Sequence, residues 1–252
     1  MINVLICGAF GKMGANVYSL LKDDENAKVV AGVDVKAGEL DGVSVYDDFE
    51  KISERIDVII DFSSPTVLER EMAFAKKVNC AVVLATTGYT KEQLAFIDEC
   101  AKLVPVFKTA NFSLGVNLIV KLAKKAAEVL GEDFDVEIIE KHHNQKVDAP
   151  SGTALMLADA VNEAFDCSKE YLNGREGAVG KRGKEIGIHA VRGGTIAGDH
   201  DVLFCGEDEI VGVSHSARSK KIFASGAIKA AKWIAGKPAG KYDMTDLLGD
   251  LL

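Results

Sequence analysis

The chain has 252 residues, 48% of them hydrophobic, and a formal net charge of −8 at pH 7. A chain of this length can bury a sizeable core and is expected to form two domains, and its negative charge argues against nucleic acid as the main partner. The sequence shows no signal peptide and no uninterrupted apolar run long enough to cross a membrane. Its five cysteines lack metal-ligand spacing, so we predict free thiols, no metal and a cytoplasmic protein.

The first elements predict a nucleotide-binding turn. Residues 2–7 form a short apolar run typical of a strand buried on both faces, and a helix is expected from residue 11 to 22. Between them, Gly8-Ala-Phe-Gly-Lys-Met-Gly14 is a Gly-x-x-Gly-x-x-Gly variant of the dinucleotide fingerprint. Such glycines permit a tight turn and the close approach of a pyrophosphate. A second strand, at 28–33, leads to Asp34, whose carboxylate could accept from a ribose hydroxyl or serve as an ordinary turn residue.

Strands and helices go on alternating up to residue 112, which predicts a parallel sheet. Ligands bind such sheets at the carboxyl ends of the strands, where this chain carries small and polar residues. These segments are Asp61-Phe-Ser-Ser64, Thr86-Thr-Gly88 and Thr109-Ala-Asn-Phe112. Further strands are expected at 56–62, 80–86 and 103–107, and helices at 65–78 and 91–102.

After residue 112 the pattern changes to an amphipathic helix followed by alternating strands, which predicts an α+β domain with a mainly antiparallel sheet. A glycine- and lysine-rich stretch at 168–185 is expected to be a mobile loop, and a helix at 221–235 is expected to pack back on the first domain. The helix is expected at 113–130 and the strands at 136–141, 187–192, 196–204 and 209–215. The fold class is therefore α/β, with a Rossmann-type parallel sheet domain beside the α+β domain.

The most informative stretch of the chain is Glu140-Lys-His-His-Asn-Gln-Lys-Val-Asp-Ala-Pro-Ser-Gly-Thr-Ala-Leu155. Its histidines can exchange a proton near neutral pH, its Lys146 supplies a positive charge, and its Ser-Gly-Thr turn opens a predicted helix whose free N–H groups can bind an anion. Each feature has a plainer interpretation, namely satisfied histidines at a strand end, a solvated lysine and an ordinary helix cap. Together they favour a pocket for a small anionic substrate.

These motifs resemble those of the 4-hydroxy-tetrahydrodipicolinate reductase family, also called dihydrodipicolinate reductases, of lysine and diaminopimelate biosynthesis. The resemblance runs from end to end and is most specific in the segment 140–154. It extends to the Gly8–Gly14 turn, Thr86-Thr-Gly88, Asn111-Phe-Ser-x-Gly-Val-Asn117, Val191-Arg-x-Gly194 and Tyr242-Asp-Met-x-Asp-Leu-Leu248.

The resemblance implies that a nicotinamide delivers hydride to a cyclic dicarboxylate after loss of water, and that a proton is then added at the neighbouring carbon. It assigns His142 as the proton donor and Lys146 as its cationic helper. Substrate binding is assigned to His143, Gly152 and Thr153, with Ser151 close by. Dinucleotide binding is assigned to Gly8, Ala9, Phe10, Gly11, Lys12, Met13, Asp34, Ala85, Thr86, Thr87, Thr109, Ala110, Asn111 and Phe112.

NADH or NADPH is the expected cofactor. Asp34 should accept from the ribose diol of NADH and repel a 2′-phosphate, whereas Lys36 could bind that phosphate, so NADH is expected to be modestly favoured. The chain departs from the family pattern at Ala85, where a glycine is usual, and at Lys220, where we expect an arginine that Arg218 could replace.

The resemblance also implies a homotetramer. The change of pattern after residue 112 and the returning helix predict a dinucleotide-binding domain of residues 1–112 and 221–252 and a substrate-binding domain of residues 113–220. The resemblance assigns oligomerisation to the second of these domains. Two other classes are alternatives: another two-domain NAD(P)-dependent dehydrogenase acting on an amino acid or a sugar, and a non-catalytic NAD-binding sensor. Neither has a reason to carry the whole 140–154 segment.

Overall fold

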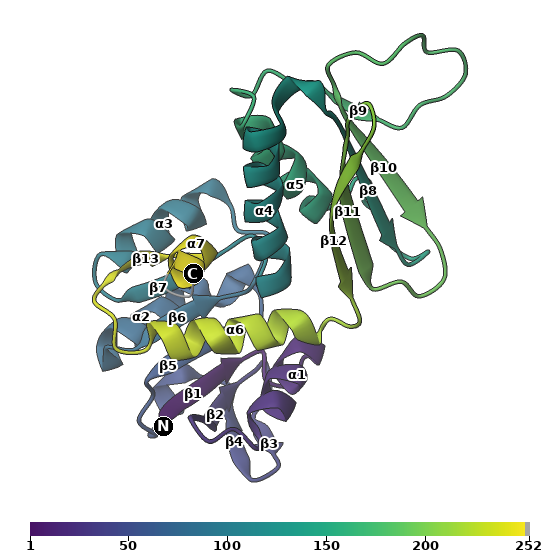
Figure 1. Ribbon diagram of the computed structural model, residues 1–252. Coiled ribbons are helices and arrows are strands. Elements are labelled where there is room, and N and C mark those ends of the chain that lie inside the picture. Colours follow the sequence, from purple (N-terminus) through teal and green to yellow (C-terminus); the bar gives the residue numbers. More distant parts are fainter. Residues whose placement is uncertain (250–252) are drawn as a thin grey trace. The chain divides into compact units, whose positions relative to one another are not determined.

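The computed structural model describes residues 1–249 (Figure 1). Two compact units account for them: Met1–Leu114 with the described residues from Lys221 onward, and Gly115–Lys220. The α/β fold class is confirmed.

An eight-stranded sheet forms the centre of the first unit. Its strands are β1 (Ile2–Cys7), β2 (Ala27–Val33), β3 (Gly38–Leu40), β4 (Val43–Tyr46), β5 (Val58–Asp61), β6 (Ala81–Leu84), β7 (Pro105–Lys108) and β13 (Gly240–Tyr242). The order is β13-β7-β6-β5-β1-β2-β4-β3, and every pair is parallel except β3 with β4. The chain leaves β1 for β2 on one side and later returns to β5 on the other, so β1 marks the switch point where ligands bind in such sheets.

Helices cover both faces of this sheet because its central strands are apolar throughout. In β1, Val4 and Ile6 face one core cluster and Leu5 and Cys7 face another, as the two-residue period of a strand requires. The first core is completed by α1 (Lys12–Leu21), α6 (Lys221–Ile234) and α7 (Met244–Gly249). The second is completed by α2 (Leu68–Val78) and α3 (Lys91–Ala101).

The expected elements of this unit are all present. β1 has its predicted bounds and β2 begins one residue earlier than predicted, whereas β5, β6 and β7 are shorter than predicted. The start of the helix predicted at 65–78 is instead a 3₁₀ turn over Pro65–Val67, which Ser64 caps. Three strands were not predicted, namely β3, β4 and β13. Each has three or four residues, too few for a period-2 pattern to stand out from a loop.

The second unit is a five-stranded sheet with α4 (Leu114–Leu130) and α5 (Gly152–Glu163) packed on one face (Figure 1). Its strands are β8 (Asp135–His142), β9 (Tyr171–Asn173), β10 (Ile186–Arg192), β11 (Gly198–Cys205) and β12 (Ile210–Ala217), in the order β12-β11-β8-β10-β9. The long ladders of β11 with β8 and β12 are antiparallel, whereas β10 pairs in parallel with β8 and β9. The predicted α+β character is confirmed.

The segment 168–185 is more structured than expected. It contains β9, and its two arginines hold the far face of the sheet at Glu137. Arg175 donates two hydrogen bonds to that carboxylate at 2.8 and 3.1 Å, and Arg182 donates a third at 3.1 Å. The prediction of a mobile loop missed these contacts because they join residues 38 and 45 positions apart. Within residues 1–249, no helix is both long and apolar enough to cross a membrane.

Candidate functional site

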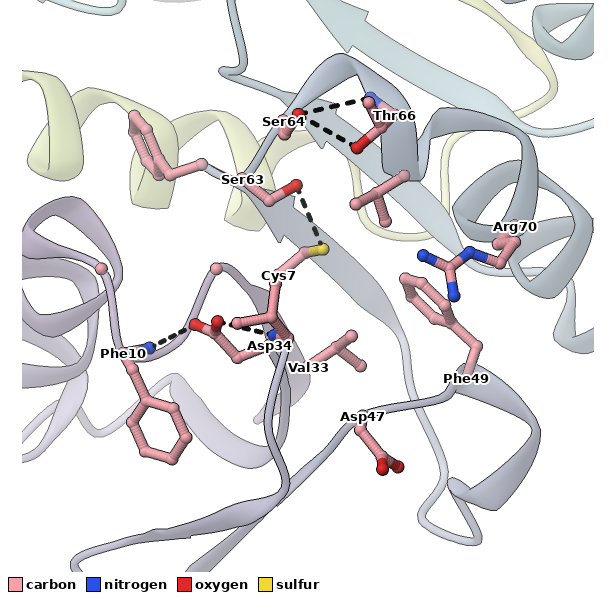
Figure 2. A pocket seen from close by; sticks show the side chains of 15 residues that line it. Cys7, Phe10, Val33, Asp34, Asp47, Phe49, Ser63, Ser64, Thr66 and Arg70 are labelled. Carbon is pink, nitrogen blue, oxygen red and sulfur yellow. Dashed lines mark hydrogen bonds between the residues drawn. The ribbon is translucent and has the colours of Figure 1, made fainter.

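A pocket of about 630 Å³ opens at the carboxyl ends of β1, β2 and β5 (Figure 2). Four of the predicted dinucleotide-binding residues line it, namely Gly8, Phe10, Gly11 and Asp34. The position matches the switch point of the sheet, so this pocket is the best candidate for a nucleotide site in the first unit.

Two glycines of the turn are required by its geometry. Gly8 has a positive φ of 80°, and a Cβ there would lie 2.8 Å from the carbonyl oxygen of Phe62. A Cβ on Gly14 would overlap the carbonyl oxygen of Gly8, so the helix could not pack so closely on the turn. The first turn of α1 has no acidic residue and no side-chain cap, which suits an anion at its N-terminus.

Asp34 is fixed in place at the pocket wall. Its carboxylate accepts hydrogen bonds from the backbone N–H groups of Phe10 at 2.8 Å and Val35 at 2.7 Å. The contact with Phe10 joins the end of β2 to the glycine turn (Figure 2). Lys36, the predicted counterpart of Asp34, does not line this pocket.

The other predicted cofactor residues lie outside the pocket. Ala9 and Phe112 are buried core residues, and the ring of Phe112 contacts the rings of Phe62 and Phe107. Lys12 and Met13 begin α1. The remaining residues follow β6 (Ala85, Thr86, Thr87) or β7 (Thr109, Ala110, Asn111), at the same edge of the sheet.

Sequence reasoning missed several residues of the pocket wall. Asp47, Phe49, Thr66 and the exposed Arg70 line it (Figure 2). Asp47 lies in a loop, Phe49 and Thr66 lie in two short 3₁₀ segments, and Arg70 lies in α2. None of them belongs to a motif, so the sequence offered no signal for them.

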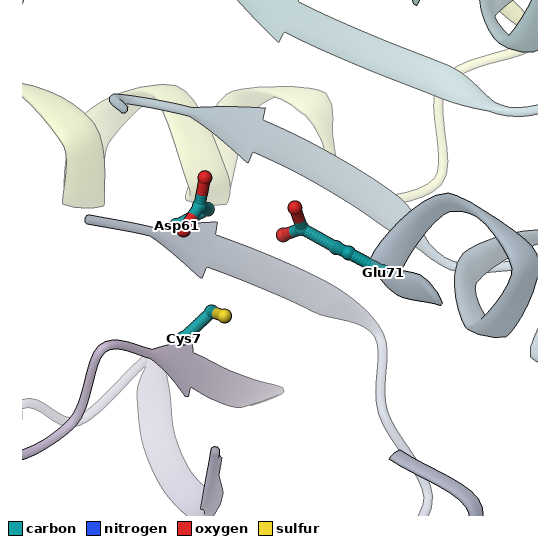
Figure 3. A group of neighbouring side chains, drawn as sticks. All are labelled: Cys7, Asp61 and Glu71. Atoms are coloured by element: carbon teal, nitrogen blue, oxygen red, sulfur yellow. The ribbon is translucent and has the colours of Figure 1, made fainter. Parts of the chain in front are cut away.

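Beneath this pocket lies a buried acidic group, formed by Cys7, Asp61 and Glu71 (Figure 3). One ligand atom from each lies within 4.8 Å of the others, a geometry a metal ion could use. Burial raises the pKa of all three groups, which favours their protonated forms. Asp61 accepts from the backbone N–H and hydroxyl of Ser63 and from Tyr89, whereas neither carboxylate oxygen of Glu71 has a partner among the described residues. The group is therefore better suited to holding a proton on Glu71 than a metal.

The second unit brings His142 against a buried carboxylate. Nδ1 of His142 lies 2.7 Å from Oε2 of Glu140, and Arg192 donates to both oxygens of Glu140 at 2.7 Å. The backbone N–H of Ser151 donates to Oε1 at 3.0 Å. Burial alone would raise the pKa of Glu140, but the hydrogen bonds from Arg192, His142 and Ser151 outweigh it and hold that pKa below its usual range.

A second buried histidine, His200, lies beside His142. The two rings meet edge to face at 5.2 Å, and Nε2 of His200 lies 3.0 Å from the Ser151 hydroxyl. Burial, and next the neighbouring His142, lower the pKa of His200 to about 4, so His200 is neutral near pH 7. Sequence reasoning assigned no role to Glu140, Arg192 or His200. The sequence could have pointed to Glu140 and His200 only because each is a polar residue at a strand position that faces the core.

The remaining predicted residues surround the start of α5. Ser151 caps this helix through its hydroxyl, which accepts from the N–H of Ala154 at 3.2 Å, and Gly152 has open space where a side chain would be. Thr153 follows in the same turn. Lys146 pairs with Asp148 at 2.8 Å.

Among residues 1–249, His143, Arg218 and Lys220 form no ion pair. Nδ1 of His143 is buried without a partner among the described residues. Arg218 and Lys220 are both exposed beyond β12, so either side chain is available to an anion.

Comparisons with known proteins cover nearly the whole chain. The family model for the N-terminus of dihydrodipicolinate reductase matches residues 2–112, and that for the C-terminus matches residues 115–248. A 4-hydroxy-tetrahydrodipicolinate reductase from Caldanaerobacter subterraneus subsp. tengcongensis is 49% identical over 249 residues, which are 98% of each chain. A protein of the same name from Clostridium tetani is 44% identical over 98% of this chain and 97% of its own.

A solved structure is similar over the same extent. A dipicolinate-bound dihydrodipicolinate reductase from Paenisporosarcina sp. TG-14 is 30% identical, with a TM-score of 0.81, and the match covers 96% of this chain and 97% of that one. Two family models that together span the chain, and relatives far above 30% identity, leave one conclusion. The chain belongs to the dihydrodipicolinate reductase family.

Proposed function

We propose that this chain catalyses the NAD(P)H-dependent reduction of 4-hydroxy-tetrahydrodipicolinate to tetrahydrodipicolinate in lysine and diaminopimelate biosynthesis. The observation that carries the proposal is the position of His142, whose Nδ1 lies 2.7 Å from the carboxylate of the buried Glu140. Family membership and the nucleotide pocket support the same conclusion.

The residues fit the demands of this reaction. The substrate is a dianion, and Lys146 with the N–H groups that open α5 supply positive charge for its carboxylates. A dinucleotide held by the segments 8–13, 85–87 and 109–112 would supply the hydride for the ring once water has left. His142 then gives a proton from Nε2 to the neighbouring carbon, which neutralises the charge that hydride addition creates. His143, Ser151, Gly152 and Thr153 are proposed to hold the substrate in place.

A spectrophotometric assay tests the proposal. NADH loss is followed with the freshly made enzymatic product of aspartate semialdehyde and pyruvate. We expect turnover, and we expect His142→Gln to lower kcat by about 10²-fold or more while changing KM less. The matched control is His189→Gln, which removes a histidine bound to Glu137 in the same sheet and should leave kcat near that of the wild type.

The same assay separates the alternatives. Another dehydrogenase would leave this substrate untouched and oxidise an amino acid or a sugar with NAD(P)⁺. A sensor would bind NADH without any turnover. An unchanged kcat in His142→Gln would remove His142 from the role of proton donor.

We also propose that both NADH and NADPH serve as cofactors and that NADH is favoured, because Asp34 is held at the pocket wall where it can accept from a ribose diol. The dinucleotide is proposed to extend along the segments 8–13, 85–87 and 109–112.

A cytoplasmic homotetramer completes the proposal. All five cysteines are free, as suits a reducing compartment, and β12 is an edge strand whose unpaired side can meet another chain. Light scattering at micromolar concentration tests the assembly, and a monomer there would refute it.

A further inference from the structure

We propose that Glu140 is a positioning residue, which fixes His142 with its proton on Nδ1 and so reserves Nε2 for proton delivery to the substrate. This inference rests on the proposed function and explains how the ring of His142 is oriented. Neither the sequence motifs nor the family resemblance assigns a role to Glu140.

The contacts of Glu140 leave its carboxylate no freedom to turn. Oε1 accepts from Arg192 at 2.7 Å and from the Ser151 N–H at 3.0 Å. Oε2 accepts from Arg192 at 2.7 Å and faces Nδ1 of His142 at 2.7 Å. Each oxygen thus has two partners, and the whole side chain is shielded from solvent. A bidentate guanidinium is the contact best suited to hold a carboxylate in one plane.

The negative charge of Glu140 determines which ring nitrogen of His142 carries the hydrogen. The bonds from Arg192 and the Ser151 amide keep Glu140 ionised, and an ionised carboxylate can only accept. Nδ1 must therefore be the donor in that pair, and in the neutral ring Nε2 is the nitrogen that can gain a proton. A buried carboxylate holds a catalytic imidazole by the same logic in other enzymes.

Three separate segments meet at this carboxylate. Glu140 and His142 are two residues apart in β8 and so lie on one face, Arg192 is the register partner of His142 in β10, and Ser151 begins α5. His142 is thereby aligned with the turn that is proposed to bind the substrate.

The surroundings of His142 agree with this assignment. His200, on the neighbouring strand, is held neutral and places no second cation beside the imidazolium. Gly198 lacks a side chain at the point where a Cβ would lie 3.0 Å from Nε2 of His142. Position 198 therefore places no side chain against the ring nitrogen that would deliver the proton.

The kinetic test uses Glu140→Gln. A neutral amide stabilises the imidazolium less and can present its NH₂ to Nδ1, which would favour the wrong tautomer. We expect kcat to fall by about 10- to 100-fold, less than in His142→Gln. The loss should be larger at pH 8 than at pH 6, with KM little changed. The matched control, Asp201→Asn, breaks the 2.8 Å ion pair between β11 and Lys141 of β8 and should keep kcat and its pH profile.

A measurement on the wild-type protein does not depend on folding of the variant. The ¹⁵N shifts of the His142 ring, assigned by comparison with His142→Gln, should show hydrogen on Nδ1 at pH 8. A neutral ring with hydrogen on Nε2 would overturn the inference, as would a normal kcat and pH profile in Glu140→Gln.

The two proposals fail differently. If the wild type turns over and His142→Gln does not, but Glu140→Gln is normal, the positioning role is wrong and the reductase function stands. If the wild type has no reductase activity, the function is wrong, and the ring shifts still report whether Glu140 fixes the tautomer.

Discussion

Glu140 and Glu71 are both completely buried, yet their surroundings favour opposite forms. Glu140 accepts four hydrogen bonds from three residues and keeps its charge, whereas Glu71 has no partner among the described residues and lies beside a second carboxylate, Asp61. Burial, and next the charge of Asp61, raise the pKa of Glu71 well above its usual value. Residue type alone therefore does not determine the charge of an acidic residue in this fold.

Glu71 should make the protein less stable as pH rises. In the unfolded chain this carboxyl ionises near pH 4.5, while in the folded chain it stays protonated to a much higher pH. The folded state therefore holds the extra proton, and the free energy of unfolding falls by up to about 1.4 kcal/mol per pH unit in that window. Glu71→Gln removes this penalty and should raise Tm more at pH 8 than at pH 5.

The exposed neighbour Glu69 gives the matched control, because Glu69→Gln on the same helix should leave the pH dependence of Tm unchanged. An equal loss of Tm at both pH values in Glu71→Gln would mean that Glu71 has a structural role as an anion.

Asp34 should set the cofactor preference. Since a charge-assisted contact at a partly exposed site is worth ~1–2 kcal/mol, NADH should be favoured by less than about a hundredfold in kcat/KM. Asp34→Ala should erode this preference. Lys36→Ala and Arg70→Ala, measured in parallel, show which cation meets a 2′-phosphate, and a wild type that strongly prefers NADPH would contradict the assignment of Asp34.

Lys146 should matter for binding as well as for rate. Its pairing with Asp148 holds the ammonium group beside the turn that leads into α5. If Lys146 contacts the dianion and the transition state, Lys146→Ala should both raise KM and lower kcat. An unchanged KM would show that Lys146 does not touch the substrate.

The carboxylate of Glu137 in β8 connects the loop between β9 and β10 to the sheet. Burial would raise the pKa of Glu137, but Arg175, His189 and Arg182 lower it to about 2. This stabilisation is fully present above the unfolded pKa near 4.5 and is lost as pH falls towards 2.

Removing that charge should free the loop between β9 and β10. We expect trypsin to cut Glu137→Gln faster than the wild type at the basic residues of the loop, Lys181, Arg182 and Lys184. Glu176→Gln, an exposed change within the loop, is the control. Equal cleavage rates in Glu137→Gln and the wild type would mean that other contacts hold the loop.

For the whole molecule, the proposed reaction requires the two ligands to meet in one complex. A nicotinamide that contacts the substrate ring excludes water from it, so each ligand should strengthen the binding of the other. We expect dipicolinate to bind at least about fivefold more tightly with NADH present, measured by calorimetry. ADP-ribose, which lacks the nicotinamide, is the control and should give no coupling. Equal affinity with and without NADH would count against a shared complex.

Features that depend on a local sequence pattern could be predicted without a structure. The Gly-x-x-Gly-x-x-Gly turn, the alternating apolar strands and the 140–154 segment predicted the fold class, the family and the segments that carry the candidate site. Glycine stereochemistry and strand period act over a few residues, so these features can be read without a structure.

The groups that surround those segments could be identified only from the folded structure. Arg192 reaches Glu140 across 52 positions and His200 reaches Ser151 across 49, and neither contact follows from spacing. Within residues 1–249 Glu71 has no hydrogen-bond donor, whereas Glu140 accepts four hydrogen bonds, although both are glutamates in regular elements. The chemistry of a buried acid depends on solvent exclusion and on donors from distant strands, and these exist only once the chain has folded.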